Sequence, residues 1–123
     1  WMDQEKLVKK INSADVCLGA FGDTPQSLMT IQNKIYECMA VGKPVITGRS
    51  PAVENIFKDD YHLIIVDRNP FSIAEGVKYL YQNPKQKENI AKAGKNLFYS
   101  KYDLVNLGRT IKQILDKILN KKI

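Results

Sequence analysis

Three short runs of apolar residues, separated by segments with helical periodicity, most constrain the fold of this chain. The runs are Val16–Phe21, Val45–Thr47 and His62–Val66. Each is short and almost continuously apolar, which is typical of a strand covered on both faces. Strands that alternate with helices in this way form a parallel sheet of the α/β class. The sequence therefore predicts a Rossmann-like domain of three layers, with a short parallel sheet of about three strands and two extra C-terminal helices.

The segments between and after these runs have apolar residues every three or four positions, which predicts helices. Ser50, Asn69 and Asn83 each precede a proline, a strong signal for the start of a helix. Gln86, three residues after Asn83, predicts a capping box. Residues 22–29 contain a glycine, a proline and hydroxyl residues, and they are predicted to form a loop. The last two helices have no strand between them, so we expect them to pack across the sheet or against another domain.

The stretch Thr30–Gly48 (TIQNKIYECMAVGKPVITG) combines a predicted helix, a glycine stop and a buried strand. Gly42 follows the last apolar turn of the helix and can adopt the left-handed conformation that ends it. The polar side of the helix carries Asn33, Lys34 and Glu37. A helix start beside a loop, with one lysine and one glutamate, can bind phosphate and hydroxyl groups. The alternative is an ordinary surface helix whose charged side chains are only solvated.

Ligands of open α/β sheets bind at the carboxyl ends of the strands. Three predicted loops lie there: Gly22–Thr30, Gly48–Ser50 and Asp67–Asn69. The first is the longest, and it leads into the helix that bears Lys34 and Glu37. We therefore expect a ligand to bind beside this loop.

The chain carries 19 basic and 13 acidic residues, a net charge of +6. The excess lies late, in a helix that Asp103 is predicted to cap and whose apolar residues fall on one side. Basic residues between positions 109 and 123 are Arg109, Lys112, Lys117, Lys121 and Lys122, against the single acid Asp116. Such a charge attracts phosphate, an anionic membrane surface or nucleic acid without selecting among them. A solvated helix face is the alternative.

The cysteines and the single histidine do not have the spacing of a metal site. Cys17 and Cys38 are interpreted as buried, reduced thiols, and with His62 alone a zinc site is not expected. No apolar run approaches the roughly 20 residues of a membrane span. The chain begins at Trp1 without a signal peptide, which indicates a fragment of a longer protein. Its 123 residues suffice for one domain.

The segment from Asn33 to Ile46, NKIYECMAVGKPVI, resembles the NKxxExMAxGKPVI segment of group 1 (family 4-like) glycosyltransferases. These are retaining enzymes of GT-B architecture that use nucleotide sugars. Ser13–Val16 resembles the xADVxLxP strand of the family, and Pro51–Glu54 resembles its GxxEx turn. The resemblance covers nearly all 123 residues in order. It implies that residues 1–123 are a single, partial donor-binding domain, with the N-terminal acceptor domain and the first part of this domain absent.

The resemblance also implies roles for the residues around the central helix. Backbone N–H groups at the helix start hold the donor diphosphate in the family, and Lys34 can add a charge-assisted contact. Glu37 matches the second acid of a paired-glutamate motif, which accepts hydrogen bonds from the ribose hydroxyls. The positions that match the diphosphate site are Thr30, Ile31, Gln32, Asn33 and Lys34.

One position departs from the family pattern. The first acid of the motif lies eight residues before the second, and that position here is Met29, which cannot accept a strong hydrogen bond from a sugar hydroxyl. The loop containing Gly22 and Asp23 is a candidate for contact with the donor sugar instead. No catalytic base or nucleophile is identified, and the fragment alone is expected to be inactive.

The function that we expect is transfer of a sugar, of the hexosyltransferase type, from a nucleotide diphosphate sugar to a glycan or lipid-linked acceptor bound by the missing domain. Polysaccharide biosynthesis and a cytoplasmic location, peripheral at the inner face of the membrane through the basic residues, belong to this expectation. No metal, cofactor or nucleic acid is expected, whereas a truncated sheet predicts self-association. The alternatives are a non-catalytic, flavodoxin-like binding or regulatory module and a basic nucleic-acid-binding domain.

Overall fold

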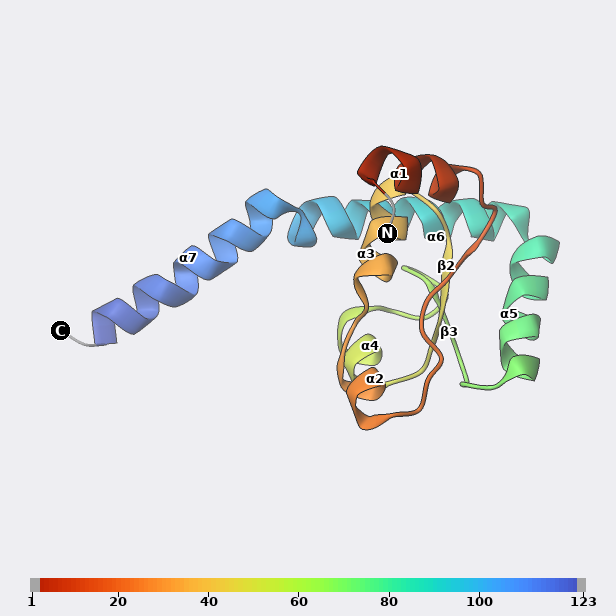
Figure 1. Ribbon diagram of the computed structural model, residues 1–123, viewed down its shortest axis with the longest axis horizontal. Helices are drawn as coiled ribbons and strands as arrows, with labels where there is room; N and C mark the ends of the chain where they lie inside the picture. The colour runs from red at the N-terminus through yellow and green to blue at the C-terminus, as the bar shows by residue number, and fades with distance from the viewer. Residues whose placement is uncertain (1–2, 122–123) are drawn as a thin grey trace.

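The computed structural model describes residues 3–121 and has helices on both faces of a three-stranded sheet (Figure 1). The strands are β1 (Cys17–Leu18), β2 (Val45–Gly48) and β3 (Ile64–Val66). They are parallel and lie in the order β1-β2-β3, with Cys17 opposite Val45 and Ile46 opposite Ile64. The predicted α/β class and the short parallel sheet are confirmed.

The helices follow the predicted alternation, with one addition. Their bounds are α1 (Gln4–Asn12), α2 (Pro25–Met29), α3 (Asn33–Val41), α4 (Pro51–Ile56), α5 (Pro70–Gln82), α6 (Pro84–Leu97) and α7 (Leu104–Lys121), with a π-helix, η1 (Phe98–Tyr102), between the last two. Helix α2 lies in the segment predicted as a loop. Thr24 caps it and Pro25 stands at its first turn, the same signal that starts α4.

The core has two parts, one on each face of the sheet. Helices α1, α3 and α4 contribute side chains such as Ile11, Ile35 and Val53 to the first. Helices α5 and α6 contribute Leu80 and Ile90 to the second, which packs on the other face. The apolar side predicted for α3 is confirmed. Its residues Ile35, Cys38 and Met39 are buried, and the half-buried Ile31 precedes the helix.

Helix α6 contacts both parts of the core near the amino ends of the strands. Gly94 packs so closely here that an added Cβ atom would lie 2.9 Å from the His62 carbonyl oxygen. Helix α3 ends at the same edge of the sheet, at Gly42, whose φ of 90° is the left-handed conformation that the sequence predicted. The amino ends of the strands are therefore closed by α6, and their carboxyl ends face α2 and α4.

The first strand is shorter than predicted. The apolar run Val16–Phe21 forms only the two residues of β1, and the Leu18 side chain is 49% exposed. The physical reason is its position, because β1 lies at the edge of the described sheet and pairs only with β2. Beyond it the backbone still bonds to β2, with Gly19 N–H donating to the Ile46 carbonyl at 2.7 Å.

The capping box predicted at the start of α6 is wrong. The Asn83 side chain donates back to the Tyr79 carbonyl at 2.8 Å and does not cap α6. Gln86 instead donates to the Asp60 carbonyl and carboxylate, at 2.8 and 3.1 Å. Asp60 has a positive φ of 59° and also accepts from the Tyr79 hydroxyl. Gln86 therefore ties α6 to the turn before β3.

The last two helices behave differently from each other. Helix α6 packs across the body as expected, whereas α7 projects away from it beyond the first turn (Figure 1). Asp103 accepts from the backbone N–H of Asn106 at 2.9 Å, so the predicted cap of α7 is confirmed. Among the described residues, no helix is both long and apolar enough to cross a membrane.

Candidate functional site

The start of α3 has the backbone geometry of an anion site. Gln32 is the N-cap residue, and no side chain of the described residues accepts a hydrogen bond from the first turn of α3. By contrast, Asp3, Ser50 and Asn69 cap their helices with side-chain oxygens. The first turn of α3 also contains no acidic residue. The Ile35 N–H donates to the Gln32 carbonyl at 3.1 Å, which leaves the backbone N–H groups of Asn33 and Lys34 at the tip of the helix without a cap. These groups and the helix dipole favour a negatively charged ligand.

The residues just before α3 are ordered by contacts with α2. The Thr30 hydroxyl donates to the Gln26 carbonyl at 2.9 Å, and the Gln32 amide donates to the Thr30 hydroxyl at 3.4 Å. Lys34 is exposed and forms no ion pair with a carboxylate of the described part of the chain. Its ammonium group is therefore not neutralised by a neighbour and can approach an anion at the helix start.

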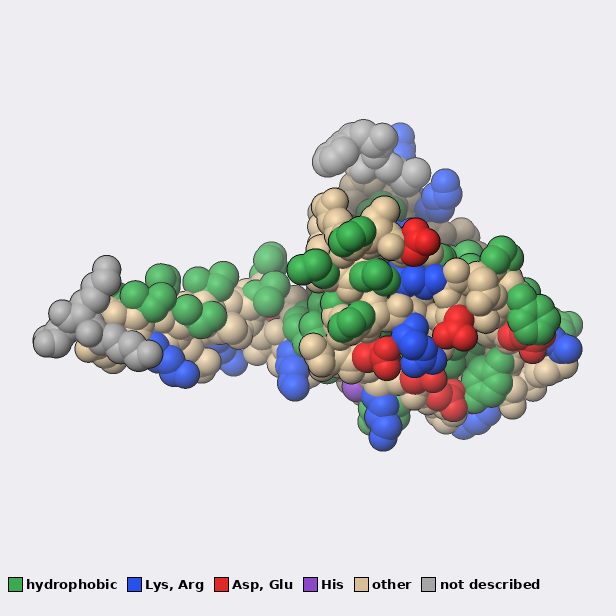
Figure 2. All heavy atoms as spheres, turned by 90° about the horizontal axis from the view of Figure 1, so that it is seen from below, with side chains coloured by type: hydrophobic (Ala, Val, Ile, Leu, Met, Phe, Trp, Pro, Cys, Tyr) green, Lys and Arg blue, Asp and Glu red, His purple; other side chains and the backbone are tan. Residues whose placement is uncertain are grey.

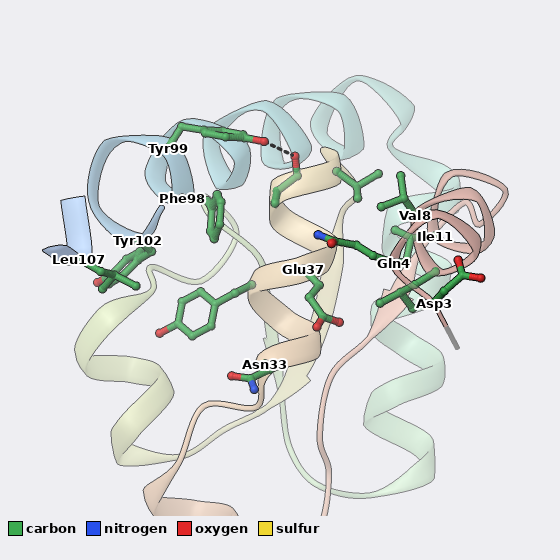
Figure 3. Close-up of a pocket in the computed structure, with 14 residues that line it drawn as sticks. Asp3, Gln4, Val8, Ile11, Asn33, Glu37, Phe98, Tyr99, Tyr102 and Leu107 are labelled. Carbon is green, nitrogen blue, oxygen red and sulfur yellow. Dashed lines mark hydrogen bonds between the residues drawn. The ribbon is translucent and has the colours of Figure 1, made fainter. Parts of the chain in front are cut away.

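Glu37 lies one turn further along α3, in a groove of about 1040 Å³ on the outer side of the helix (Figure 3). Asn33 lines the same groove, as do the polar residues Asp3, which caps α1, and Gln4, the first residue of α1. The rest of the lining is largely apolar and comes from α1, α3, η1 and α7; these residues are Leu7, Val8, Ile11, Tyr36, Ala40, Val41, Phe98, Tyr99, Tyr102 and Leu107.

The structure therefore brings together only some of the predicted site residues. Asn33 and Glu37 share the groove, whereas Thr30, Ile31, Gln32 and Lys34 do not line it. These four residues lie at the helix start itself, at the carboxyl end of the sheet. An extended ligand would have to run from the start of α3 along the helix to contact both groups.

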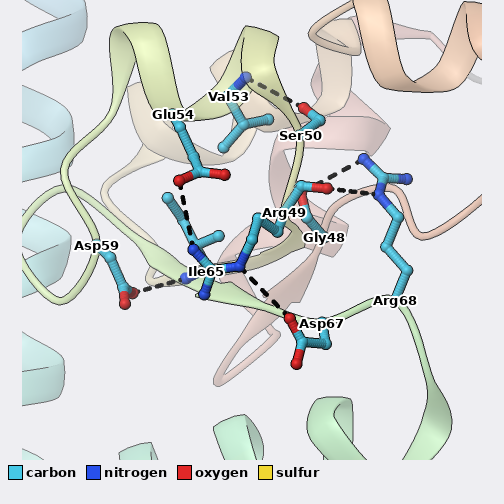
Figure 4. A network of polar contacts seen from close by, with 9 residues as sticks. All are labelled: Gly48, Arg49, Ser50, Val53, Glu54, Asp59, Ile65, Asp67 and Arg68. Atoms are coloured by element: carbon cyan, nitrogen blue, oxygen red, sulfur yellow. Dashed lines mark hydrogen bonds and ion pairs between the residues drawn. The ribbon is translucent and has the colours of Figure 1, made fainter.

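Arg68 holds the loops at the carboxyl end of the sheet together (Figure 4). Its Nε donates to the Arg49 carbonyl at 2.9 Å and its Nη2 donates to the Gly48 carbonyl at 3.4 Å. Its Nη1 donates to the Gly22 carbonyl and, at 3.3 Å, to the Ser27 hydroxyl. One guanidinium group thus fastens the loop after β1 to the turn after β2. The predicted sugar-contacting loop is held at Gly22, whereas Asp23 is exposed.

Arg49 is neutralised on the same edge of the sheet. Its guanidinium group lies 3.4 Å from Glu54 and 3.4 Å from Asp67 (Figure 4). Both arginines lie just beyond strands: Arg49 immediately follows β2, and Arg68 stands two residues after the end of β3. Sequence reasoning missed their part in the site, although their positions after two strands were a usable signal.

Met29 is the last residue of α2, and its side chain is 77% exposed. It stands where the resemblance predicts the first acid of the family motif, and its thioether cannot accept the strong hydrogen bonds that a carboxylate would accept. The one acid of the loop before α2, Asp23, lies six residues earlier in the sequence.

The two cysteines are buried side by side in the core. Burial, followed by the hydrogen bond and proximity to Cys17, raises the pKa of the Cys38 thiol to about 12. Both cysteines are free and buried. Enclosed thiols are poor nucleophiles and metal ligands, so this pair has a packing role. Within residues 3–121 no cluster of three or more histidine, cysteine or acidic residues is placed to hold a metal ion.

A three-stranded parallel sheet with helices on both faces defines a Rossmann-like domain. Residues 1–116 match the family described as glycosyl transferase-like, and the chain belongs to this family. The resemblance to group 1 glycosyltransferases of GT-B architecture is confirmed. No curated protein sequence matches the chain.

Solved structures share the fold at low sequence identity. Sucrose-phosphate synthase from Thermosynechococcus elongatus matches 98% of the chain with a TM-score of 0.80 at 16% identity. HepE from Anabaena, in complex with UDP, matches 89% with a TM-score of 0.76 at 14% identity. The C-terminal domain of a group 1 glycosyl transferase from Francisella tularensis matches 85% with a TM-score of 0.68 at 21% identity. The chain spans 29%, 29% and 51% of these structures, respectively.

Proposed function

We propose that this chain is the donor-binding part of a retaining glycosyltransferase. The enzyme transfers a sugar, of the hexosyl type, from a nucleotide diphosphate sugar to a glycan or lipid-linked acceptor. The observation that carries the proposal is the uncapped start of α3 at the carboxyl end of the sheet, in a chain of the glycosyl transferase-like family. The chain is a single partial domain in this proposal, and another part of the enzyme binds the acceptor.

The donor diphosphate binds at the start of α3. The backbone N–H groups between Thr30 and Asn33 donate to its oxygens, and Lys34 adds one positive charge. This charge is available because Lys34 has no ion-pair partner among the described residues. The same groups stabilise the diphosphate as it leaves with additional negative charge, which is the step that such a site accelerates.

Glu37 binds the ribose of the donor. Its exposed carboxylate faces the groove one turn from Asn33, so it can accept hydrogen bonds from two adjacent hydroxyl groups. The sugar end of the donor lies against the loop that contains Gly22 and Asp23, which Arg68 holds in place. With Met29 at the position of the first acid, this end of the site makes fewer polar contacts than the diphosphate end.

Two further expectations complete the proposal. The enzyme acts in polysaccharide biosynthesis in the cytoplasm, peripheral to the inner face of the membrane. The isolated chain also self-associates through the free edge of β1, beside which the Leu18 side chain is exposed.

The test is a titration of the chain with UDP, GDP, UDP-glucose and inorganic pyrophosphate, followed residue by residue by NMR. The complex of HepE with UDP motivates the choice of uridine ligands. Each nucleotide and pyrophosphate should shift the amide signals of residues 30–34. Amide signals in this segment that stay unchanged at millimolar concentrations of every ligand would contradict the proposal.

Variants separate the two parts of the site. Lys34→Ala should weaken binding of both UDP and pyrophosphate, whereas Glu37→Gln should weaken only UDP, each by about tenfold because one charge-assisted contact is lost. Lys78→Ala and Glu75→Gln, exposed on α5, are the matched controls and should change neither affinity. Equal losses for both ligands in Glu37→Gln would remove the ribose assignment and leave the diphosphate assignment intact.

A further inference from the structure

The loop between β1 and α2 is held at both ends and has one polar anchor in its middle. At its start, the Ala20 N–H donates to a side-chain hydroxyl of β2 at 3.2 Å, and at its end the Thr24 hydroxyl caps α2. Residues 21–23 lie between these two points. Within the described part of the chain, their only hydrogen bond is the one that the Gly22 carbonyl accepts from Arg68. One guanidinium group therefore positions the middle of this loop.

The side chain of Arg68 reaches the loop through space that a glycine leaves open (Figure 4). A Cβ atom added to Gly48 would lie 2.7 Å from the Arg68 Cγ and 2.9 Å from its Nε. All recorded acceptors of the guanidinium group are neutral, namely the carbonyls of Gly22, Gly48 and Arg49 and the Ser27 hydroxyl. Unlike Arg49, Arg68 forms no ion pair with a carboxylate of the described residues. Its donors therefore serve the loops alone.

The positioned segment offers polar groups at the carboxyl end of the sheet. Figure 2 views the molecule from the side of α2 and α4 and shows acidic and basic side chains intermingled over this end. Phe21 packs against the core, whereas Asp23 is exposed. The backbone N–H groups of Gly22 and Asp23 have no acceptor among the described residues. A carboxylate and two free N–H groups can accept from and donate to the hydroxyl groups of a sugar.

We propose that Arg68 is a positioning residue that determines how much the sugar adds to the affinity for the donor. This inference rests on the proposed function, in which the sugar lies against the loop that contains Gly22 and Asp23. Arg68 does not contact the donor itself. It fixes the Gly22 carbonyl, so that the adjacent N–H groups and the Asp23 carboxylate keep the arrangement that contacts the sugar. A guanidinium group suits this role because three separate nitrogens donate, whereas a lysine has one.

The test compares the affinities of the complete chain for UDP-glucose and UDP, and for GDP-mannose and GDP, by isothermal titration calorimetry. In the unmodified chain, the sugar should increase the affinity in at least one of these pairs. Arg68→Ala and Arg68→Lys should each lower the affinity for that sugar nucleotide by about tenfold and leave the affinity for the matching nucleotide diphosphate within about twofold. Because lysine keeps the charge and loses the fork, equal losses in the two variants assign the effect to positioning.

The matched control is Gln86→Ala, which removes a side-chain donor to the Asp60 carbonyl at the opposite end of the sheet and should change no affinity. Hydrogen exchange in the free chain should be faster in α2 for the Arg68 variants and unchanged there for the control. The inference is overturned if the sugar adds nothing in either pair, if an Arg68 variant loses both members of a pair equally, or if Arg68→Lys binds as the unmodified chain does. A chain that binds neither nucleotide diphosphate nor pyrophosphate would contradict the proposed function, and the inference with it.

Discussion

Helices α3 and α7 have the same kind of sequence pattern and opposite surroundings. In α3 the apolar stripe is buried between the sheet, α4 and α6, and Ile35 is fully enclosed. In α7 an apolar stripe of greater length is exposed to solvent. The difference shows that periodicity identifies the face of a helix that avoids water but does not identify what covers it.

The largest effect is expected when one isoleucine of the apolar face is truncated to alanine in each helix. Ile35→Ala should lower the free energy of unfolding by about 2–5 kcal/mol, because it leaves a cavity in a closed core. Ile114→Ala should change it by no more than about 0.5 kcal/mol, since the side chain is already hydrated. Urea denaturation measures both. Similar losses in the two variants would mean that α7 is covered in solution.

The second test compares the contacts that hold the loops at the carboxyl end of the sheet with the cap that starts α7. Arg68→Ala should lower the free energy of unfolding by about 1–3 kcal/mol, because several carbonyl oxygens lose a charged donor. Asp103→Ala should cost about 1 kcal/mol of helix stability, confined to α7. Hydrogen exchange distinguishes them: faster exchange in residues 20–50 is expected only for the first, and in α7 only for the second.

Glycine substitutions should have opposite signs in the two helices. Gly42→Ala should destabilise the chain by about 1 kcal/mol, because alanine must adopt a positive φ at the end of α3. Gly108→Ala should stabilise α7 by about 1 kcal/mol, because the position lies inside the helix and an added Cβ atom would meet no other described group within 4 Å. Thermal unfolding followed by circular dichroism checks both. Destabilisation by Gly108→Ala would indicate that a partner approaches this position closely.

The smallest expected effect is a dependence of the stability of the body on pH, with no corresponding effect on α7. Burial, and then Lys101 and Lys58, lower the pKa of His62 from its usual value of 6.5. The unfolded chain therefore binds a proton more readily, and stability should fall as the pH drops below 6.5 toward the lowered pKa. In His62→Gln, whose amide oxygen can still accept from the Lys58 N–H, this part of the dependence should disappear. A slope that persists unchanged in the variant would assign it to other groups.

Most helices and strands of the body could be predicted from the sequence alone. Local signals placed α4 and α5, with their caps at Ser50 and Asn69, and the end of α3 at Gly42. The same reasoning overlooked α2, although Thr24 and Pro25 form an equivalent signal, because proximity to a glycine favoured a loop. The errors at β1 and Asn83 have another origin. Both depend on which neighbours the chain meets in three dimensions, and a local pattern does not contain that information.

The candidate site was less predictable than the fold. Its position at the start of α3 followed from the order of strands and helices and from the family resemblance. The groove around Glu37 could not be predicted, because α1, α3 and η1 come together to form it from distant parts of the sequence. Arg68 joins residues up to 46 positions apart, so its contacts also required the folded chain.

Asp103 has a consequence for how far α7 can reach. It is extended, with φ of −70° and ψ of 168°, between two helical segments. The direction of the helix depends on this residue and on the Asn106 amide, which donates to the Tyr99 carbonyl at 3.0 Å. An 18-residue helix is a lever about 27 Å long, so a rotation of 10° at this hinge would move its tip by about 5 Å. A small change in the two backbone angles of Asp103 therefore moves the far end of the apolar face of α7 by several ångströms relative to the body.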